Sequence, residues 1–161
     1  MSYISHIHAR RVWDSRGVPT IEVDIHCENG RMGRAIAPSG ASRGTREALE
    51  LRDGGQHLGG KDVSQAIAKV NGPIADALKG CHIQQQAEID RRLLELDNSP
   101  LKEVIGGNAI TATSLAALHA GAHDADIPMW AHCAKLAGTE PSLPLPEIQI
   151  FGGGAHAGRR V

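Results

Sequence analysis

Ala37–Pro38–Ser39–Gly40–Ala41–Ser42–Arg43–Gly44 is the stretch at which the sequence changes from a strand-like pattern to a helix-like one. Apart from Arg43, its side chains are small or absent, and its two glycines give the backbone torsional freedom. Ser39 and Ser42 add hydroxyl groups. Such a loop can move and can bring oxygens close to a charged ligand, although its composition also suits an ordinary surface turn.

The residues before this loop predict three strands joined by short turns. The clearest pattern runs from Thr20 to Cys27, where apolar residues occupy one face and Glu22, Asp24 and His26 the other, as a solvent-facing or interface stripe. Residues 4–13 precede it as a first strand, and residues 31–37 follow it as a third. Because Asn29–Gly30 suits a tight hairpin turn, the three strands are expected to form an antiparallel meander.

After the loop, apolar residues recur every three or four positions, as they do along one face of a helix. Gly72–Pro73 interrupts one of these runs, so we expect a bend or break there. Strands followed by helices indicate an α+β fold. The expected helical segments are 45–53, 67–78, 89–96, 108–125 with Asn108 as the N-cap, and a short helix that Pro128 opens and Gly138 ends.

The last part of the sequence has a different composition. Residues 139–146 contain three prolines and are predicted to form a linker. Leu145 to Phe151 resembles the start of another strand, and the glycine-rich stretch 152–158 follows it directly. A single strand cannot bury itself alone, so this strand would need partners outside the sequence.

Composition excludes several functional classes. The chain has 161 residues, a formal net charge of −1 and 2% aromatic residues, so it lacks the basic surface and stacking side chains of nucleic-acid-binding domains. Cys27, Cys81 and Cys133 are far apart and form no CxxC pair, and no apolar run reaches membrane-spanning length. These features predict a cytoplasmic protein with neither a nucleic-acid nor a membrane partner.

Several motifs, taken together and in this order, closely resemble the amino-terminal part of enolase (phosphopyruvate hydratase). The resemblance covers essentially all of the sequence. Its motifs are Asp14–Ser15–Arg16–Gly17 with Pro19–Thr20, Ala37–Ser42, Glu47–Asp53, Val70–Ile74, Gly107–Ile110 with Ser114–Ala116, and Gly153–Gly154 with His156–Ala157.

The resemblance implies a chain in two parts. Residues 1–138 would form an enolase-type capping domain, and residues 139–161 a linker and the first strand of a large β/α barrel. It also implies that a full-length parent would be a lyase of glycolysis, a homodimer that reversibly dehydrates 2-phosphoglycerate to phosphoenolpyruvate with Mg²⁺.

The same resemblance implies two site residues. Ser39 would supply oxygens to a second magnesium ion as the mobile loop of Pro38, Gly40, Ala41 and Ser42 closes, which agrees with the preference of Mg²⁺ for hard oxygen ligands. His156 would contact the substrate from the barrel side. On spacing alone, a lone histidine after a glycine run is more typical of a turn.

The resemblance also implies that much of the catalytic apparatus lies elsewhere. The family's three magnesium-binding carboxylates, its lysine base and its glutamate acid are on later barrel strands, beyond the last residue of this sequence. A general base must lie within hydrogen-bond reach of the proton that it removes. This chain alone is therefore expected to be an inactive fragment or truncated piece, with no catalytic residue of its own.

Departures from the family pattern keep other readings open. Arg43 stands where the family usually has threonine, Gly152 replaces an asparagine, and residues 111–113 differ from the usual apolar residues. A divergent parent could catalyse a related carboxylate-enolising reaction, or the capping domain could be a non-catalytic docking or oligomerisation module. His119 and His123, four residues apart, could bind a transition metal, but a solvated helix face explains them more simply.

Overall fold

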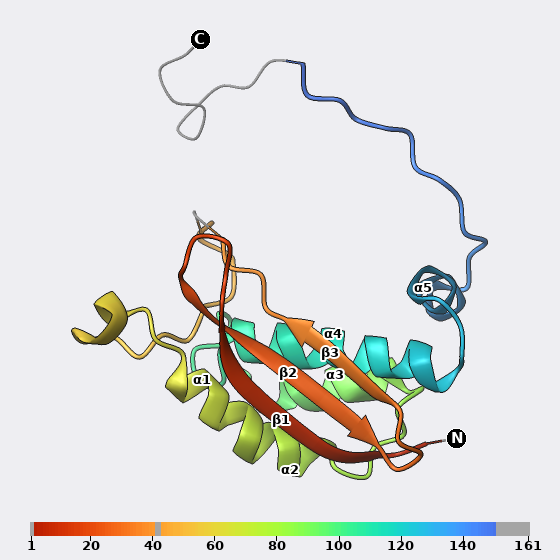
Figure 1. Ribbon diagram of the computed structural model, residues 1–161, viewed down its shortest axis with the longest axis horizontal. Coiled ribbons are helices and arrows are strands. Elements are labelled where there is room, and N and C mark those ends of the chain that lie inside the picture. The colour runs from red at the N-terminus through yellow and green to blue at the C-terminus, as the bar shows by residue number, and fades with distance from the viewer. Residues whose placement is uncertain (1, 41–42, 151–161) are drawn as a thin grey trace.

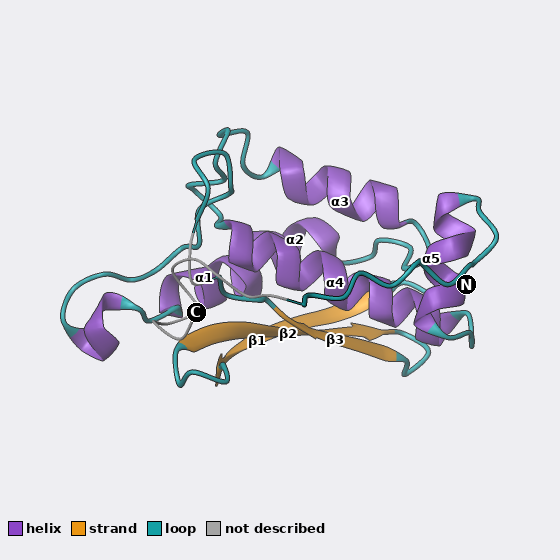
Figure 2. Cartoon of the chain, turned by 90° about the horizontal axis from the view of Figure 1, so that it is seen from above, coloured by secondary structure: helices purple, strands orange, loops and turns teal. Residues whose placement is uncertain are grey.

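The computed structural model describes residues 2–40 and 43–150, which form a three-stranded sheet with helices packed on one of its faces (Figures 1 and 2). The strands are β1 (Ile4–Trp13), β2 (Pro19–Cys27) and β3 (Met32–Ile36), in the order β1-β2-β3 with antiparallel neighbours. This architecture confirms the predicted α+β fold and its meander.

The two faces of the sheet differ as the alternation in β2 predicts. Ile21, Val23 and Ile25 are fully buried beneath the helices. On the open face Arg10 and Arg34 hold the Asp24 carboxylate at 2.7 and 2.6 Å. Hydrogen bonds from Arg34, supported by those from Arg10, lower the pKa of Asp24 although its burial opposes this. Asp24 is thus covered by its own ion pairs and does not face solvent, whereas the interface alternative for this stripe stays a prediction.

The helical run between the sheet and the later helices has an unusual middle. It contains α1 (Ser64–Lys69), the π-helical turn η2 (Val70–Ile74) and α2 (Ala75–Leu78), with a short η1 (His57–Gly60) before it. The π-helical turn contains Pro73, which has no N–H to donate, so the expected irregularity at Gly72–Pro73 is confirmed.

The longest helix, α4 (Gly107–Asp124), covers the sheet through its small residues. Ala109, Ala112 and Ala116 are fully buried. A Cβ atom on Gly33 of β3 would lie only 2.2 Å from the carbonyl oxygen of Ala116 and from the backbone nitrogen of Ala120. The strand and the helix therefore approach each other backbone to backbone, and α3 (Gln86–Glu95) packs against α4 farther from the sheet (Figure 2).

The predicted helix over residues 45–53 is wrong, because this segment contains no helix. Its backbone pairs with distant parts of the chain. Leu49 N–H donates to Leu101 at 2.7 Å and its carbonyl accepts from Gly107 at 2.7 Å, while Asp53 N–H donates to Asp62 at 2.8 Å. These long-range bonds outweigh the local helix propensity of the segment.

Asn108 does not have the role that its position suggested. Gly106 is the N-cap residue of α4, with φ of 94°, and Asn108 lies inside the helix. Its side-chain amide instead accepts from Leu51 N–H at 3.0 Å and donates to the Leu51 carbonyl at 3.2 Å. Asn108 therefore pins the extended segment 49–53 against the start of α4.

Residues 139–150 extend away from the helices without forming a helix or a strand (Figure 1). Leu143 and Leu145 are more than nine-tenths exposed. The strand predicted for Leu145 to Phe151 is not formed over its described part, residues 145–150. Across the described residues, every helix is too short or too polar to cross a membrane.

The last helix, α5 (Met129–Ala137), follows Pro128 and ends at Gly138, which is in the left-handed conformation, as predicted. Its buried anchor is His132, only 1% exposed, whose Nδ1 has no hydrogen-bond partner among the described residues. A Cβ atom on Gly121 of α4 would lie 2.8 Å from His132 Nε2, so the ring packs directly on the helix backbone.

We predict that mild acid loosens α5. Burial, with a smaller effect of Lys135, lowers the pKa of His132 below its ordinary value of 6.5. Stability from the neutral ring is thus complete above pH 6.5 and is lost as the pH falls below that value. His132→Leu should flatten the pH dependence of urea unfolding between pH 7 and 5, whereas His8→Gln, at an exposed position, should preserve it. Equal slopes for His132→Leu and the parent chain would contradict this role.

Candidate functional site at the loop after the third strand

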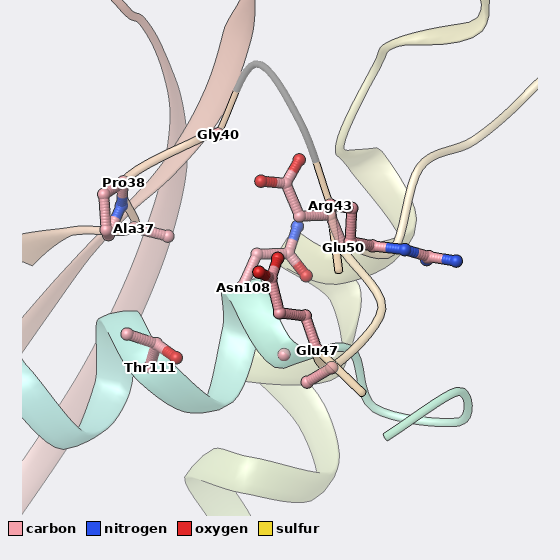
Figure 3. Close-up of a pocket in the computed structure, with 10 residues that line it drawn as sticks. Ala37, Pro38, Gly40, Arg43, Glu47, Glu50, Asn108 and Thr111 are labelled. Carbon is pink, nitrogen blue, oxygen red and sulfur yellow. The ribbon is translucent and has the colours of Figure 1, made fainter. Parts of the chain in front are cut away.

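The loop after β3 begins as a continuation of the sheet. Ala37 N–H donates to the Ile21 carbonyl at 3.0 Å, and its own carbonyl accepts from the Thr20 hydroxyl at 2.9 Å. These bonds extend the β2–β3 pairing by one residue. The chain then leaves the sheet, and Pro38 and Gly40 lie above α4 in the view of Figure 3.

Ser39 is bound by two guanidinium groups. Arg16 donates from Nη2 to the Ser39 carbonyl at 2.8 Å, and Arg52 donates from Nη2 to the Ser39 hydroxyl at 3.2 Å. The Ser39 hydroxyl in turn donates to Oε2 of Glu50 at 3.3 Å. Both oxygens of Ser39 therefore have partners in this arrangement.

Arg16 is itself fixed within the turn between β1 and β2. Its Nη2 donates to Asp14 Oδ2 at 3.0 Å, and the other Asp14 oxygen accepts from Arg16 N–H and Val18 N–H, both at 2.8 Å. The hydrogen bond from Val18, with those from Arg16, lowers the pKa of Asp14. The charged Asp14 carboxylate thus orients Arg16 toward the loop.

A pocket of about 380 Å³ lies between the loop and the first turns of α4 (Figure 3). The Glu47 and Glu50 carboxylates lie near the Asn108 amide, and the Arg43 side chain extends away from Thr111. The residues that line this pocket are Ala37, Pro38, Gly40, Arg43, Glu47, Ala48, Glu50, Gly107, Asn108 and Thr111.

The structure places only part of the predicted site. Pro38, Ser39 and Gly40 lie together at the base of the loop, but Ala41, Ser42, Gly152 and His156 lie outside the described residues. The roles predicted for Ser39 and His156 stay predictions.

The alternative histidine pair gains no support from its surroundings. His123 Nδ1 lies 2.6 Å from the Met32 carbonyl oxygen, so one ring nitrogen is already engaged. Burial, with a smaller effect of His123, lowers the pKa of His119. Within residues 2–40 and 43–150, no three histidine, cysteine or acidic side chains are grouped as a metal site requires.

Glu50 and Arg52 are partners of the loop that the sequence pattern does not indicate, and both bind the Ser39 hydroxyl. The motif that contains them, Glu47–Asp53, has a helix-like pattern, and a helix would turn every third or fourth side chain to a common face. In an extended segment two residues that are two positions apart point to the same face, so a Glu-x-Arg pair indicates an ion pair on that face. Their ion pair, at 2.8 Å, does lie on the loop's side of that segment.

The described residues do not fit a magnesium site in this arrangement. Magnesium ions take oxygen ligands whose lone pairs are free to face the ion. Here the two Ser39 oxygens accept from Arg16 and Arg52, and Glu50 is bound to Arg52. A divalent cation at Ser39 would lie beside the positively charged guanidinium groups of Arg16 and Arg52, which would repel it.

The fold and the loop together define a class of α+β domain in which a three-stranded meander, covered on one face by helices, presents an anchored glycine- and serine-containing loop. A family model described as "Enolase, N-terminal domain" matches residues 4–133, so the chain belongs to the enolase family and carries its N-terminal domain. The resemblance found in the sequence is therefore confirmed.

Two curated relatives extend this similarity over almost the whole chain. Enolase 1 of Lactococcus lactis subsp. cremoris (strain SK11) is 49% identical over 154 residues, which are 96% of this chain and 36% of that protein. Enolase 2 of Lactococcus lactis subsp. lactis (strain IL1403) is 48% identical over an equal share of both chains. The chain thus spans about a third of the length of these relatives.

Proposed function

We propose that this chain is the capping part of an enolase, a lyase that reversibly dehydrates 2-phosphoglycerate to phosphoenolpyruvate in glycolysis. The observation that supports this most directly is the 49% identity over 96% of the chain to a protein named enolase. The loop at residues 37–44 would close over the substrate, and His156 would contact it.

Dehydration of 2-phosphoglycerate requires cations near the carbon that loses its proton. Removal of a proton next to a carboxylate adds charge to an existing anion, and bound Mg²⁺ would offset that charge. Because the described residues do not fit a magnesium site, we propose that the ion ligands and the acid and base groups come mainly from the rest of a longer parent protein. The chain itself would contribute a capping domain whose loop is held at Ser39 by Arg16 and Arg52.

We further propose a homodimeric parent that acts in the cytoplasm. The open face of the sheet, with its Arg10–Asp24–Arg34 ion pairs, offers a polar surface for a second subunit (Figure 2). The three cysteines, of which Cys133 is exposed, are all free thiols, as suits a reducing compartment.

A chimera with a named relative tests the proposed activity. The 161-residue chain would replace the matching part of Lactococcus Enolase 1, and phosphoenolpyruvate formation would be followed by absorbance with 2-phosphoglycerate and Mg²⁺. We expect turnover by the chimera and none by the 161-residue chain alone, since a general base must be within reach of its proton. An inactive chimera that unfolds cooperatively would contradict the proposed function. Turnover by the chain alone would contradict the proposal that the acid and base groups come mainly from the rest of a longer parent protein.

A further inference from the structure

Arg52 connects four separate parts of the chain around the start of the loop. Its Nη1 donates to the carbonyls of Pro19 and Lys61, the latter at 2.6 Å, and its Nη2 donates to the Ser39 hydroxyl at 3.2 Å. Its Nε and Nη2 also bind Glu50 Oε2, at 3.2 and 2.8 Å. The rigid guanidinium fork suits such multiple contacts, and the side chain is only 20% exposed.

These contacts assign a different role to Ser39 from the one that the family resemblance implied. Its hydroxyl hydrogen is directed to Glu50 and its hydroxyl oxygen accepts from Arg52, while Arg16 occupies the carbonyl. Hydrogen bonds in which one partner is charged are stronger than neutral ones. A cation that approached either oxygen would also meet the repulsion of the guanidinium bound there.

We infer that Arg52 is a positioning residue that sets the start of the loop through Ser39, and that Ser39 is an anchor of the loop and not a ligand of magnesium. Of the two experiments below, only the measurement of magnesium activation in a chimera rests on the proposed function. The anchor itself is a property of the 161-residue chain. Arg16 supports it from the opposite side, through the carbonyl of the same residue.

Hydrogen exchange of the 161-residue chain tests the anchor without any activity. Arg52→Gln and Ser39→Ala should each speed amide exchange in a peptide covering residues 37–44 about tenfold, because each removes the same charge-assisted bond. In the double variant the shared Ser39–Arg52 bond is lost only once, so its effect should be smaller than the product of the two single effects. Arg52→Lys, which keeps the charge without the fork, should give an intermediate rate.

Arg91→Gln is the matched control, because Arg91 forms ion pairs with Glu88 and Glu95 on the exposed side of α3. It removes the same charge and should leave exchange of residues 37–44 unchanged. Urea unfolding of every variant separates a local effect on the loop from global destabilisation. Exchange in Ser39→Ala equal to that of the parent chain, or fully additive effects of Ser39→Ala and Arg52→Gln, would overturn the anchor.

The dependence of the Lactococcus chimera's activity on Mg²⁺ concentration distinguishes the two roles of Ser39, anchor of the loop or ligand of magnesium. An anchor predicts that Ser39→Ala and Arg52→Gln change the KM for 2-phosphoglycerate alike and leave the Mg²⁺ concentration for half-maximal activity within twofold. A ligand role predicts at least a tenfold increase of that concentration in Ser39→Ala alone, which would overturn the inference. If the parent chimera is inactive, the proposed function is wrong. The hydrogen-exchange experiment on the 161-residue chain still shows whether Ser39 anchors the loop.

Discussion

Replacement of Gly33 by alanine should destabilise the chain by about 3 kcal/mol, at the upper end of the usual cost of overpacking a core. The added methyl group would lie 2.2 Å from the Ala116 carbonyl oxygen and the Ala120 backbone nitrogen. Both atoms belong to the α4 backbone, so no side chain can rotate away and the helix itself must move. Urea unfolding followed by circular dichroism measures the change.

Gly30→Ala is the control for this prediction. Gly30 lies in the hairpin turn with φ of 80°, and a Cβ atom there would meet nothing within 4 Å. That variant should cost only the strain of a left-handed alanine, about 1 kcal/mol. A cost for Gly33→Ala no larger than that for Gly30→Ala would show that β3 and α4 are not held as closely as the structure has them.

The strands and most helices could be predicted because their signals are local. The alternation of Ile21, Val23 and Ile25 defines a buried face within one segment, and Pro128 and Gly138 mark both ends of α5. The extended segment 45–53 could not be predicted in this way. Its conformation depends on Leu101, Asp62 and Asn108, whose proximity only the finished fold creates.

The difference between local signals and long-range contacts also explains which parts of the candidate site could be predicted. The composition of the loop and its place after the third strand were readable from the sequence, and Pro38, Ser39 and Gly40 do lie at its base. The partners of Ser39 were not readable, because Arg16 and Arg52 reach it from segments 23 and 13 residues away. The magnesium role of Ser39, which the family resemblance implies, stays a prediction, and the hydrogen bonds of Ser39 to Arg16 and Arg52 are what the structure adds to it.

The connection between α3 and α4 contains a buried carboxylate, Asp97, which is 2% exposed. One of its oxygens accepts from the Ser99 N–H and hydroxyl, at 2.9 and 2.6 Å. The other accepts from Val104 and Ile105 N–H, at 2.8 and 2.9 Å. Burial alone would raise its pKa, but the bonds from Ser99, Ile105 and Val104 together lower it to about 2.

Asp97→Asn should therefore destabilise the chain by about 2–4 kcal/mol at pH 7, because an amide nitrogen facing one pair of donors leaves buried N–H or O–H groups unpaired. The stability that the charged Asp97 provides is complete above its ordinary pKa of 3.8 and is lost as the pH falls through about 2. The difference between the parent chain and Asp97→Asn in urea unfolding should accordingly shrink between pH 4 and pH 2.

Glu103→Gln is the matched control, since Glu103 is an exposed acid in the same connection and the exchange removes the same charge. Its effect should stay within about 0.5 kcal/mol, as for most surface substitutions. The donors of Ser99, Val104 and Ile105 converge on Asp97 just before Gly106, the N-cap residue of α4. Loss of the Asp97 carboxylate should therefore also speed exchange of the Leu49 and Gly107 amides, which join this connection to segment 45–53. An Asp97→Asn chain as stable as Glu103→Gln at pH 7 would show that the connection is held by its apolar contacts instead.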